Sequence, residues 1–97
     1  MNILQNKKQC YFTGAETGLH NHHIFFGGKY NRKLSEKYGA MVWVKWDIHL
    51  YGIHGNRQNL NYALKKRAQK KIMEQQGWDT AQFIKVFGKN YLEDNND

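Results

Sequence analysis

The clearest apolar pattern in the chain is a helical stripe in its second half. The apolar positions follow the spacing i, i+3, i+4, i+8 and i+12, and they are Leu60, Ala63, Leu64, Ala68 and Ile72. A helix that buries one face against a core has this periodicity. The stripe therefore predicts a long core helix from about Asn56 to Gln76, ended by Gly77.

Two shorter helices are also expected. Residues 31–38 have helix-forming composition and are followed by Gly39, a common residue just beyond a helix end. Near the C-terminus, Asp79 precedes Gln82 by the three-residue spacing of a capping pair. The helix that begins there should end at Gly88, and its buried side is expected to consist of Phe83, Ile84 and Phe87.

The first half of the chain predicts strands. Met41–Trp46 is the strongest of them, because β-branched and aromatic residues dominate it. Cys10–Phe12 is a short β-prone run before the Thr13-Gly14 turn. Leu19–Phe26 is expected to be a strand, and Gly27-Gly28 after it allow the backbone to turn sharply.

These elements predict one α+β domain over residues 1–97, with flexible ends at 1–8 and 93–97. Cys10 is the single cysteine, so no internal disulfide can form. The sequence shows neither an apolar leader nor an apolar run long enough to span a bilayer. A cytoplasmic protein with no membrane partner is the expectation.

The charge of the chain narrows the choice of partner. Fifteen Lys and Arg residues against eight Asp and Glu residues give a net charge of +7. Such a balance favours a polyanion, with DNA as the first choice. Contacts with its backbone are expected from five cations, Arg57, Lys65, Lys66, Lys70 and Lys71. A solvated helix face is the alternative explanation for the same run of lysines.

Histidines supply the candidate chemistry. The stretch Leu19–Gly28 holds three of the five, and the other two follow on a later element; the five are His20, His22, His23, His49 and His54. Imidazole is the commonest metal ligand and the usual general base near neutral pH. The cluster predicts a small metal site or a small nuclease. A structural zinc site that combines Cys10 with His20, His49 or His54 is an alternative.

Five motifs occur in order along nearly the whole chain. They are CYFTG at Cys10–Gly14, LHNHH at Leu19–His23, NRKLSEKYG at Asn31–Gly39, GIH at Gly52–His54 and FIKVFGKNYL at Phe83–Leu92. In this order they resemble the HNH, or His-Me finger, endonucleases, and more narrowly the small phage-encoded proteins of that class. The resemblance implies a ββα-metal core, extended here by the long basic helix and the short C-terminal helix.

The resemblance also implies roles for individual residues. His22 would be a metal ligand and His23 the general base that activates water. His49 is the first candidate to complete the metal site and His54 the second, and both could bind. Asn31 matches the orienting asparagine of the pattern, although a helix cap explains it equally well. The expected ion is Mg²⁺ or Mn²⁺, with Zn²⁺ as an alternative.

Two functions remain open at this point. The resemblance implies a phage-associated, metal-dependent endonuclease that hydrolyses DNA phosphodiester bonds. However, the segment Val42–Leu50 carries one histidine where the relatives have a pair, and it contains two tryptophans, Trp43 and Trp46, which are expected in the core. The second hypothesis is therefore a catalytically inactive, HNH-derived phage protein that binds nucleic acid or a host-defence nucleoprotein as an anti-defence inhibitor.

Overall fold

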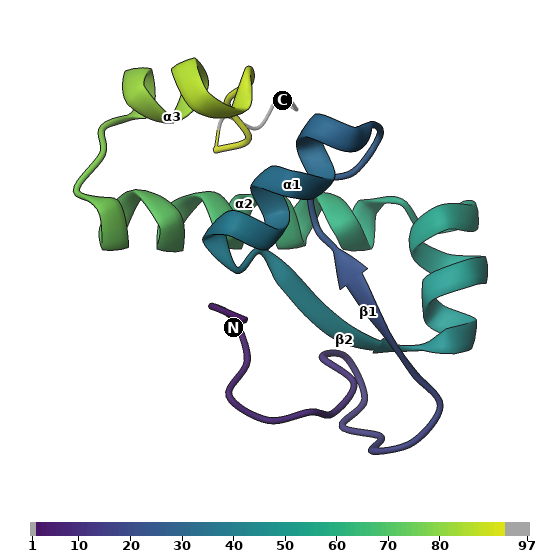
Figure 1. Cartoon of the computed structure of the whole chain (residues 1–97). Helices are drawn as coiled ribbons and strands as arrows, with labels where there is room; N and C mark the ends of the chain where they lie inside the picture. The colour runs from purple at the N-terminus through teal and green to yellow at the C-terminus, as the bar shows by residue number, and fades with distance from the viewer. Residues whose placement is uncertain (1, 93–97) are drawn as a thin grey trace.

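The computed structural model describes residues 2–92. Its elements follow in the order β1 (Leu19–His23), α1 (Lys29–Tyr38), β2 (Met41–Lys45), η1 (Ile48–Asn56), α2 (Asn59–Gln76) and α3 (Thr80–Phe87). The two strands pair in an antiparallel sheet although α1 separates them in sequence (Figure 1). The described part is thus a small α+β protein, as the sequence predicted.

The sheet has one face turned into the core. Val42 and Val44 of β2 are fully buried, whereas Met41, Trp43 and Lys45 between and beside them are not. This alternation is the period of two that places successive side chains on opposite faces. His22 lies directly opposite Val42 in the register, and it is only 1% exposed. A histidine therefore occupies a core position on β1.

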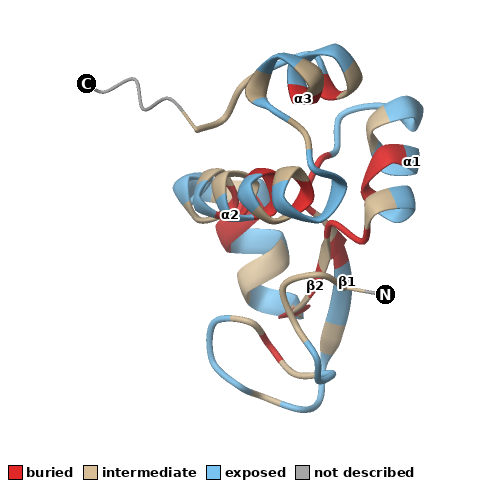
Figure 2. Ribbon diagram, turned by 90° about the vertical axis from the view of Figure 1, so that its left-hand side faces the viewer, coloured by how far each residue is buried: buried red, intermediate tan, exposed pale blue. Residues whose placement is uncertain are grey.

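Helix α2 crosses this buried face and carries the main core, which lies where α2, the sheet and α3 meet (Figure 2). Leu64, Ala68 and Ile72 are buried as predicted. Ala63 is exposed, contrary to the prediction, because the inner face of α2 follows positions 61, 64, 68 and 72. Two amides, Asn61 and Gln69, are buried beside the apolar residues.

The C-terminal helix agrees with its prediction in most respects. The Asp79 carboxylate accepts a hydrogen bond from the backbone N–H of Gln82 at 2.8 Å, which caps α3. Phe83 and Phe87 are buried and stack with their ring centroids 4.4 Å apart. Ile84 is 39% exposed, so its predicted burial is wrong.

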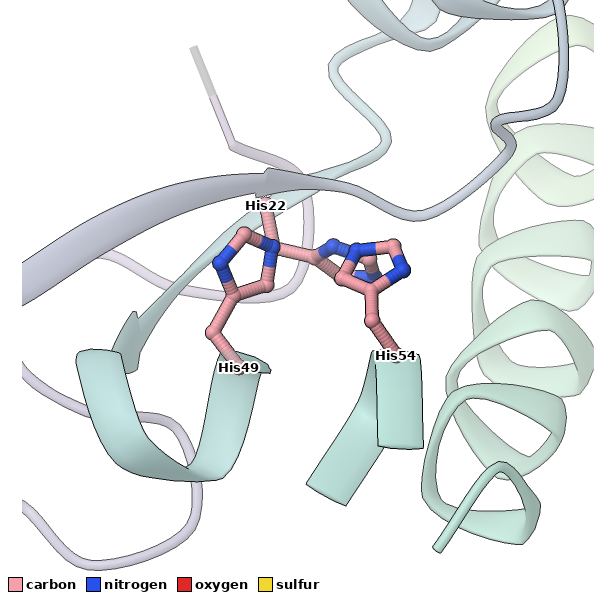
Figure 3. Close-up of side chains that lie close together, drawn as sticks. All are labelled: His22, His49 and His54. Atoms are coloured by element: carbon pink, nitrogen blue, oxygen red, sulfur yellow. The ribbon is translucent and has the colours of Figure 1, made fainter. Parts of the chain in front are cut away.

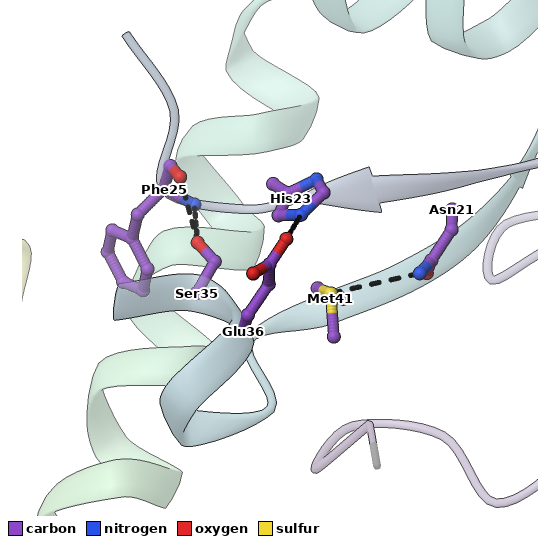
Figure 4. A network of polar contacts seen from close by, with 6 residues as sticks. All are labelled: Asn21, His23, Phe25, Ser35, Glu36 and Met41. Carbon is purple, nitrogen blue, oxygen red and sulfur yellow. Dashed lines mark hydrogen bonds and ion pairs between the residues drawn. The ribbon is translucent and has the colours of Figure 1, made fainter. Parts of the chain in front are cut away.

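Other predicted boundaries need correction. Cys10–Phe12 is not a strand. Its one backbone–backbone hydrogen bond to β2 runs from Tyr11 N–H to the Trp43 carbonyl, and Cys10 N–H turns back to the Ala15 carbonyl. Strand β1 ends at His23 and not at Phe26. The reason is a bend held by Ser35, whose hydroxyl bonds to both the N–H and the carbonyl of Phe25 (Figure 4).

The later boundaries show one element that was not predicted. The long helix begins at Asn59 instead of Asn56, and the separate helix η1 precedes it. Trp46, expected in the core, is 43% exposed beyond the end of β2. Helix α1 begins at Lys29 and ends at Gly39, whose positive φ of 72° suits a glycine.

The N-terminal residues, expected to be flexible, contact the body of the protein where they are described. Ile3 N–H bonds to the Gly39 carbonyl at 2.9 Å, and the Gln5 side-chain oxygen accepts from Trp43 N–H at 2.7 Å. The predicted flexible tail, 93–97, lies outside the described residues. Within residues 2–92, no helix combines the length and the apolarity needed to cross a membrane.

Candidate metal centre

Three imidazoles converge between the sheet and the helix that follows it. His22 comes from β1, and His49 and His54 come from η1 (Figure 3). One nitrogen of each ring lies within 4.8 Å of the others. The ring centroids of His49 and His54 are 4.7 Å apart, and each lies within 5.4 Å of the His22 centroid. The structure thus brings together the three residues to which the HNH resemblance assigns metal binding, here called the histidine triad.

The helical geometry of η1 is what pairs His49 with His54. These residues are five apart, and on an α-helix they would point about 140° away from each other. A π-helix bonds residue i to i+5 and places them on one face instead. Gly55, whose backbone angles are not helical, breaks the helix directly after His54. The Asp47 side chain starts η1 by accepting a hydrogen bond from Ile48 N–H at 2.9 Å.

Asn61 of α2 orients the His22 ring. Its amide group donates to the Ile24 carbonyl at 3.1 Å, so the amide oxygen must face His22. That oxygen lies 2.7 Å from His22 Nε2, which therefore donates its proton. The lone pair of His22 is then on Nδ1. Metal-binding histidines in proteins are commonly held this way by their second nitrogen.

His20 makes a comparable contact with His49. The Nδ1 atoms of the two rings are 2.9 Å apart, a hydrogen bond in which one of them donates. With Nδ1 of His49 engaged by His20, Nε2 is the atom of His49 that remains for a ligand. His20 is exposed and lies two residues before His22 on the same face of β1.

Two of the three triad rings, His22 and His49, have the protonation state that metal binding requires. Burial lowers the pKa of His22 to about 4; the hydrogen bond to Asn61 opposes this shift and the neighbouring His49 and His54 add to it. Burial, with contributions from His54 and His20, also lowers the pKa of His49 to about 4. Both rings are neutral near pH 7, the form that coordinates a cation. Three imidazoles this close together, two of them held neutral by burial, fit a divalent metal ion.

His23 faces away from the triad. Its neighbour His22 points toward α2, and His23 points to the other side of β1 toward α1, because successive strand residues alternate. Nε2 of His23 lies 2.9 Å from a carboxylate oxygen of Glu36 (Figure 4). A carboxylate in this position orients the imidazole ring.

The remaining predicted residues lie around this centre. The Asn31 side chain donates to the Phe26 carbonyl at 3.3 Å, in the turn before α1. Arg57 lies between η1 and α2 and lines a surface pocket with Tyr51. Lys65 lines a different pocket together with His54. Lys66, Lys70 and Lys71 belong to α2, where the Lys71 ammonium lies 3.9 Å from Glu74.

The alternative zinc site with Cys10 is not formed. Within residues 2–92 the triad is the one group of three or more His, Cys, Asp or Glu side chains close enough to share an ion. Cys10 is buried elsewhere, where its sulfur accepts from Lys45 N–H at 3.3 Å.

Asn61 is the functional residue that the sequence reasoning missed. It lies three residues before Leu64 and seven before Ala68, which is the spacing of the buried face of α2. An amide at a core position needs a hydrogen-bond partner. A polar amide at a position of the buried face was therefore the signal in the sequence that Asn61 has a buried partner. The structure shows that this partner is His22.

No protein-family model matches this chain, and no curated protein or solved structure matches it either. The fold and the site define a small α+β protein with a three-histidine candidate metal centre.

Proposed function

We propose that the chain is a metal-dependent endonuclease of the HNH type that hydrolyses phosphodiester bonds in DNA. The observation that carries the proposal is the convergence of His22 from a strand with His49 and His54 from the helix after the paired strand. This strand, strand, helix arrangement is what the HNH resemblance implies. The net charge of +7 supports a polyanionic substrate.

The donor atoms favour a particular group of metal ions. Three imidazole nitrogens suit Zn²⁺ and other late first-row ions, whereas Mg²⁺ is held mainly by oxygen ligands. The proposal therefore names Zn²⁺ first and Mn²⁺ second, and revises the Mg²⁺ expected from the resemblance. Three protein ligands leave further coordination positions, as in catalytic zinc sites.

The protein residues would divide the work as follows. When bound, the ion would stabilise negative charge on the scissile phosphate and on the leaving 3′-oxygen. His22, His49 and His54 would hold it, with Asn61 keeping Nδ1 of His22 directed at the centre. His23 would accept the proton of the attacking water, and Glu36 would stabilise the imidazolium that results.

The test combines metal binding with cleavage. Titration calorimetry with Zn²⁺, Mn²⁺ and Mg²⁺ should show the tightest binding for Zn²⁺, and His54→Ala should weaken it. Plasmid DNA should be nicked by the metal-loaded wild type. His23→Ala should lose nicking while it keeps its Zn²⁺ affinity, because His23 is not in the triad. If neither the wild type nor His23→Ala nicks DNA with any of these ions, the proposed endonuclease activity is refuted.

A second candidate is a phage protein that binds nucleic acid, or a host-defence nucleoprotein, without cleaving it. The placement of His23 favours it, since the proposed base and the triad lie on opposite sides of β1. In this case DNA binding would be salt-dependent and would survive His22→Ala and His23→Ala. It would weaken when Lys70 and Lys71 of α2 are neutralised. Loss of binding in the histidine variants alone would exclude this candidate.

A further inference from the structure

A pocket of about 400 Å³ opens beside the triad. His54 belongs to its wall, and so does Asn61, the residue that holds His22. Phe26, Tyr62 and Lys65 line it as well, and none of its lining residues between 2 and 92 carries a carboxylate. Its size is within the range of small-ligand sites in proteins. The name "Lys65 pocket" is used for this pocket below.

Lys65 places a cation in this pocket. It is partly buried, and its ammonium lies 5.5 Å from the Phe26 ring centroid and 5.1 Å from that of Tyr91. No carboxylate between residues 2 and 92 lies within ion-pair distance of it. Lys89 approaches the same Tyr91 ring at 5.6 Å and adds positive charge. Burial and this second charge both lower the pKa of Lys65. A bound anion would offset the repulsion between these two positive charges and stabilise the charged form of Lys65.

Phe26 connects the cation with the triad. Its ring lies edge-on to His54, with centroids 4.7 Å apart, and 5.7 Å from His22. The side chain is nevertheless 37% exposed. Exposed aromatic rings beside cations are the usual means by which proteins hold an unpaired base and its phosphate. The aromatic ring of Phe26 therefore matches the base of a nucleotide, and the ammonium group of Lys65 matches its phosphate.

We infer that the Lys65 pocket binds an unpaired nucleotide of the DNA strand next to the scissile phosphate. Its phosphate pairs with Lys65 and its base stacks on Phe26. The inference rests on the proposed function and adds the form of the substrate to it. A base within a duplex is already stacked and paired, so it reaches Phe26 only after leaving the helix. The preferred substrate is accordingly single-stranded or locally unpaired DNA.

Equilibrium binding to the metal-free protein tests the inference without any need for cleavage. The probes are a fluorescent oligothymidylate strand and a hairpin duplex with the same number of phosphates, both long enough for the hairpin stem to be stable. Binding is measured by anisotropy in chelator at about 0.2 M salt, where diffuse backbone contacts are weakened. The single strand should bind about ten-fold more tightly than the duplex, a modest effect for stacking one base. Thymidine 5′-monophosphate should also shift the NMR signals of Phe26 and Tyr62.

The chain offers a matched control for each variant. Lys65→Met removes the charge but keeps the aliphatic stem, and Lys85→Met does the same at an exposed position of α3. Phe26→Leu is paired with Phe12→Leu, because both phenylalanines are 37% exposed. Lys65→Met and Phe26→Leu should each lower the affinity for the single strand about ten-fold. The two controls should change it less than about two-fold, with circular dichroism confirming that all four variants fold.

The outcomes separate this inference from the proposed function. Single-strand binding that depends on Lys65 and Phe26, but without cleavage by any metal-loaded form, would support the pocket and refute the nuclease. Nicking by the Zn²⁺-loaded protein, with all four variants binding like the wild type, would support the nuclease and overturn the pocket. Equal affinity for the duplex and the single strand would also overturn it.

Discussion

Replacing Asn61 with leucine tests whether the metal centre depends on a residue that never touches the ion. Leucine has nearly the same size, but it removes the partner of His22 Nε2 at 2.7 Å and the donor to the Ile24 carbonyl at 3.1 Å. Both groups would be left buried and unsatisfied, at about 1–3 kcal/mol each. The free energy of unfolding of the metal-free protein should fall by about 2–6 kcal/mol.

The same substitution should weaken metal binding for a separate reason. Without Asn61 the His22 ring can rotate or change tautomer, so Nδ1 is no longer held toward the triad. Loss of such an orienting partner usually lowers metal affinity about 10–100-fold. Competition with a chromophoric chelator measures the affinity for Zn²⁺, and urea unfolding in chelator measures the stability of the same sample.

Gln69→Leu is the matched control for this experiment. Gln69 is a fully buried amide on the same helix, and it bonds to the Asn90 side chain at 2.8 Å and to Tyr91 N–H at 2.7 Å, away from the triad. It should lose similar stability but keep its Zn²⁺ affinity. If both variants lose stability and neither loses affinity, Asn61 is only a core residue and the reasoning about His22 is refuted.

Two further predictions concern the metal-free protein. The pKa of His22 lies near 4 in the folded state and near 6.5 in an unfolded chain, so its contribution to stability is complete above pH 6.5 and is lost as the pH falls toward 4. From pH 7 to pH 4.5 the His22 contribution to the free energy of unfolding should fall by about 2–3 kcal/mol. In urea unfolding, the free energy of unfolding should depend less on pH in His22→Gln than in the wild type. The same pH dependence in both proteins would contradict this prediction. Gly28→Ala should cost about 1–3 kcal/mol, since φ is 145° there and only glycine adopts that region freely. No atom would clash with the new methyl group, so thermal unfolding that matches the wild type would show that the loop relaxes instead.

The sequence was informative where a residue's own chemistry decides the structure. The capped helix after Asp79, the glycine end of α1 and the valine-rich strand β2 all follow from local preferences. Helix η1 was not predicted, because Gly52 and Gly55 are unfavourable in helices and a π-helix has no clear sequence signal. The pairing of His49 with His54 depends on that helix. Their approach to His22 depends on the β1–β2 register, which only tertiary packing sets.

The two histidines of the doublet lie on opposite sides of β1, and this placement bears on both proposed functions. His22 is fixed by Asn61 on the core side of β1, and His23 is fixed by Glu36 on the other side, so each imidazole has its own partner. For both to act on one phosphate, the DNA strand must pass the end of β1, where the chain bends at Ile24 and leaves the sheet. Phe26 and the Lys65 pocket lie just beyond that bend, beside His54. The two proposals meet at this end of β1, because an unpaired strand bound in the Lys65 pocket would lie beside the triad there. A protein that only binds DNA has no need of His23 at that point.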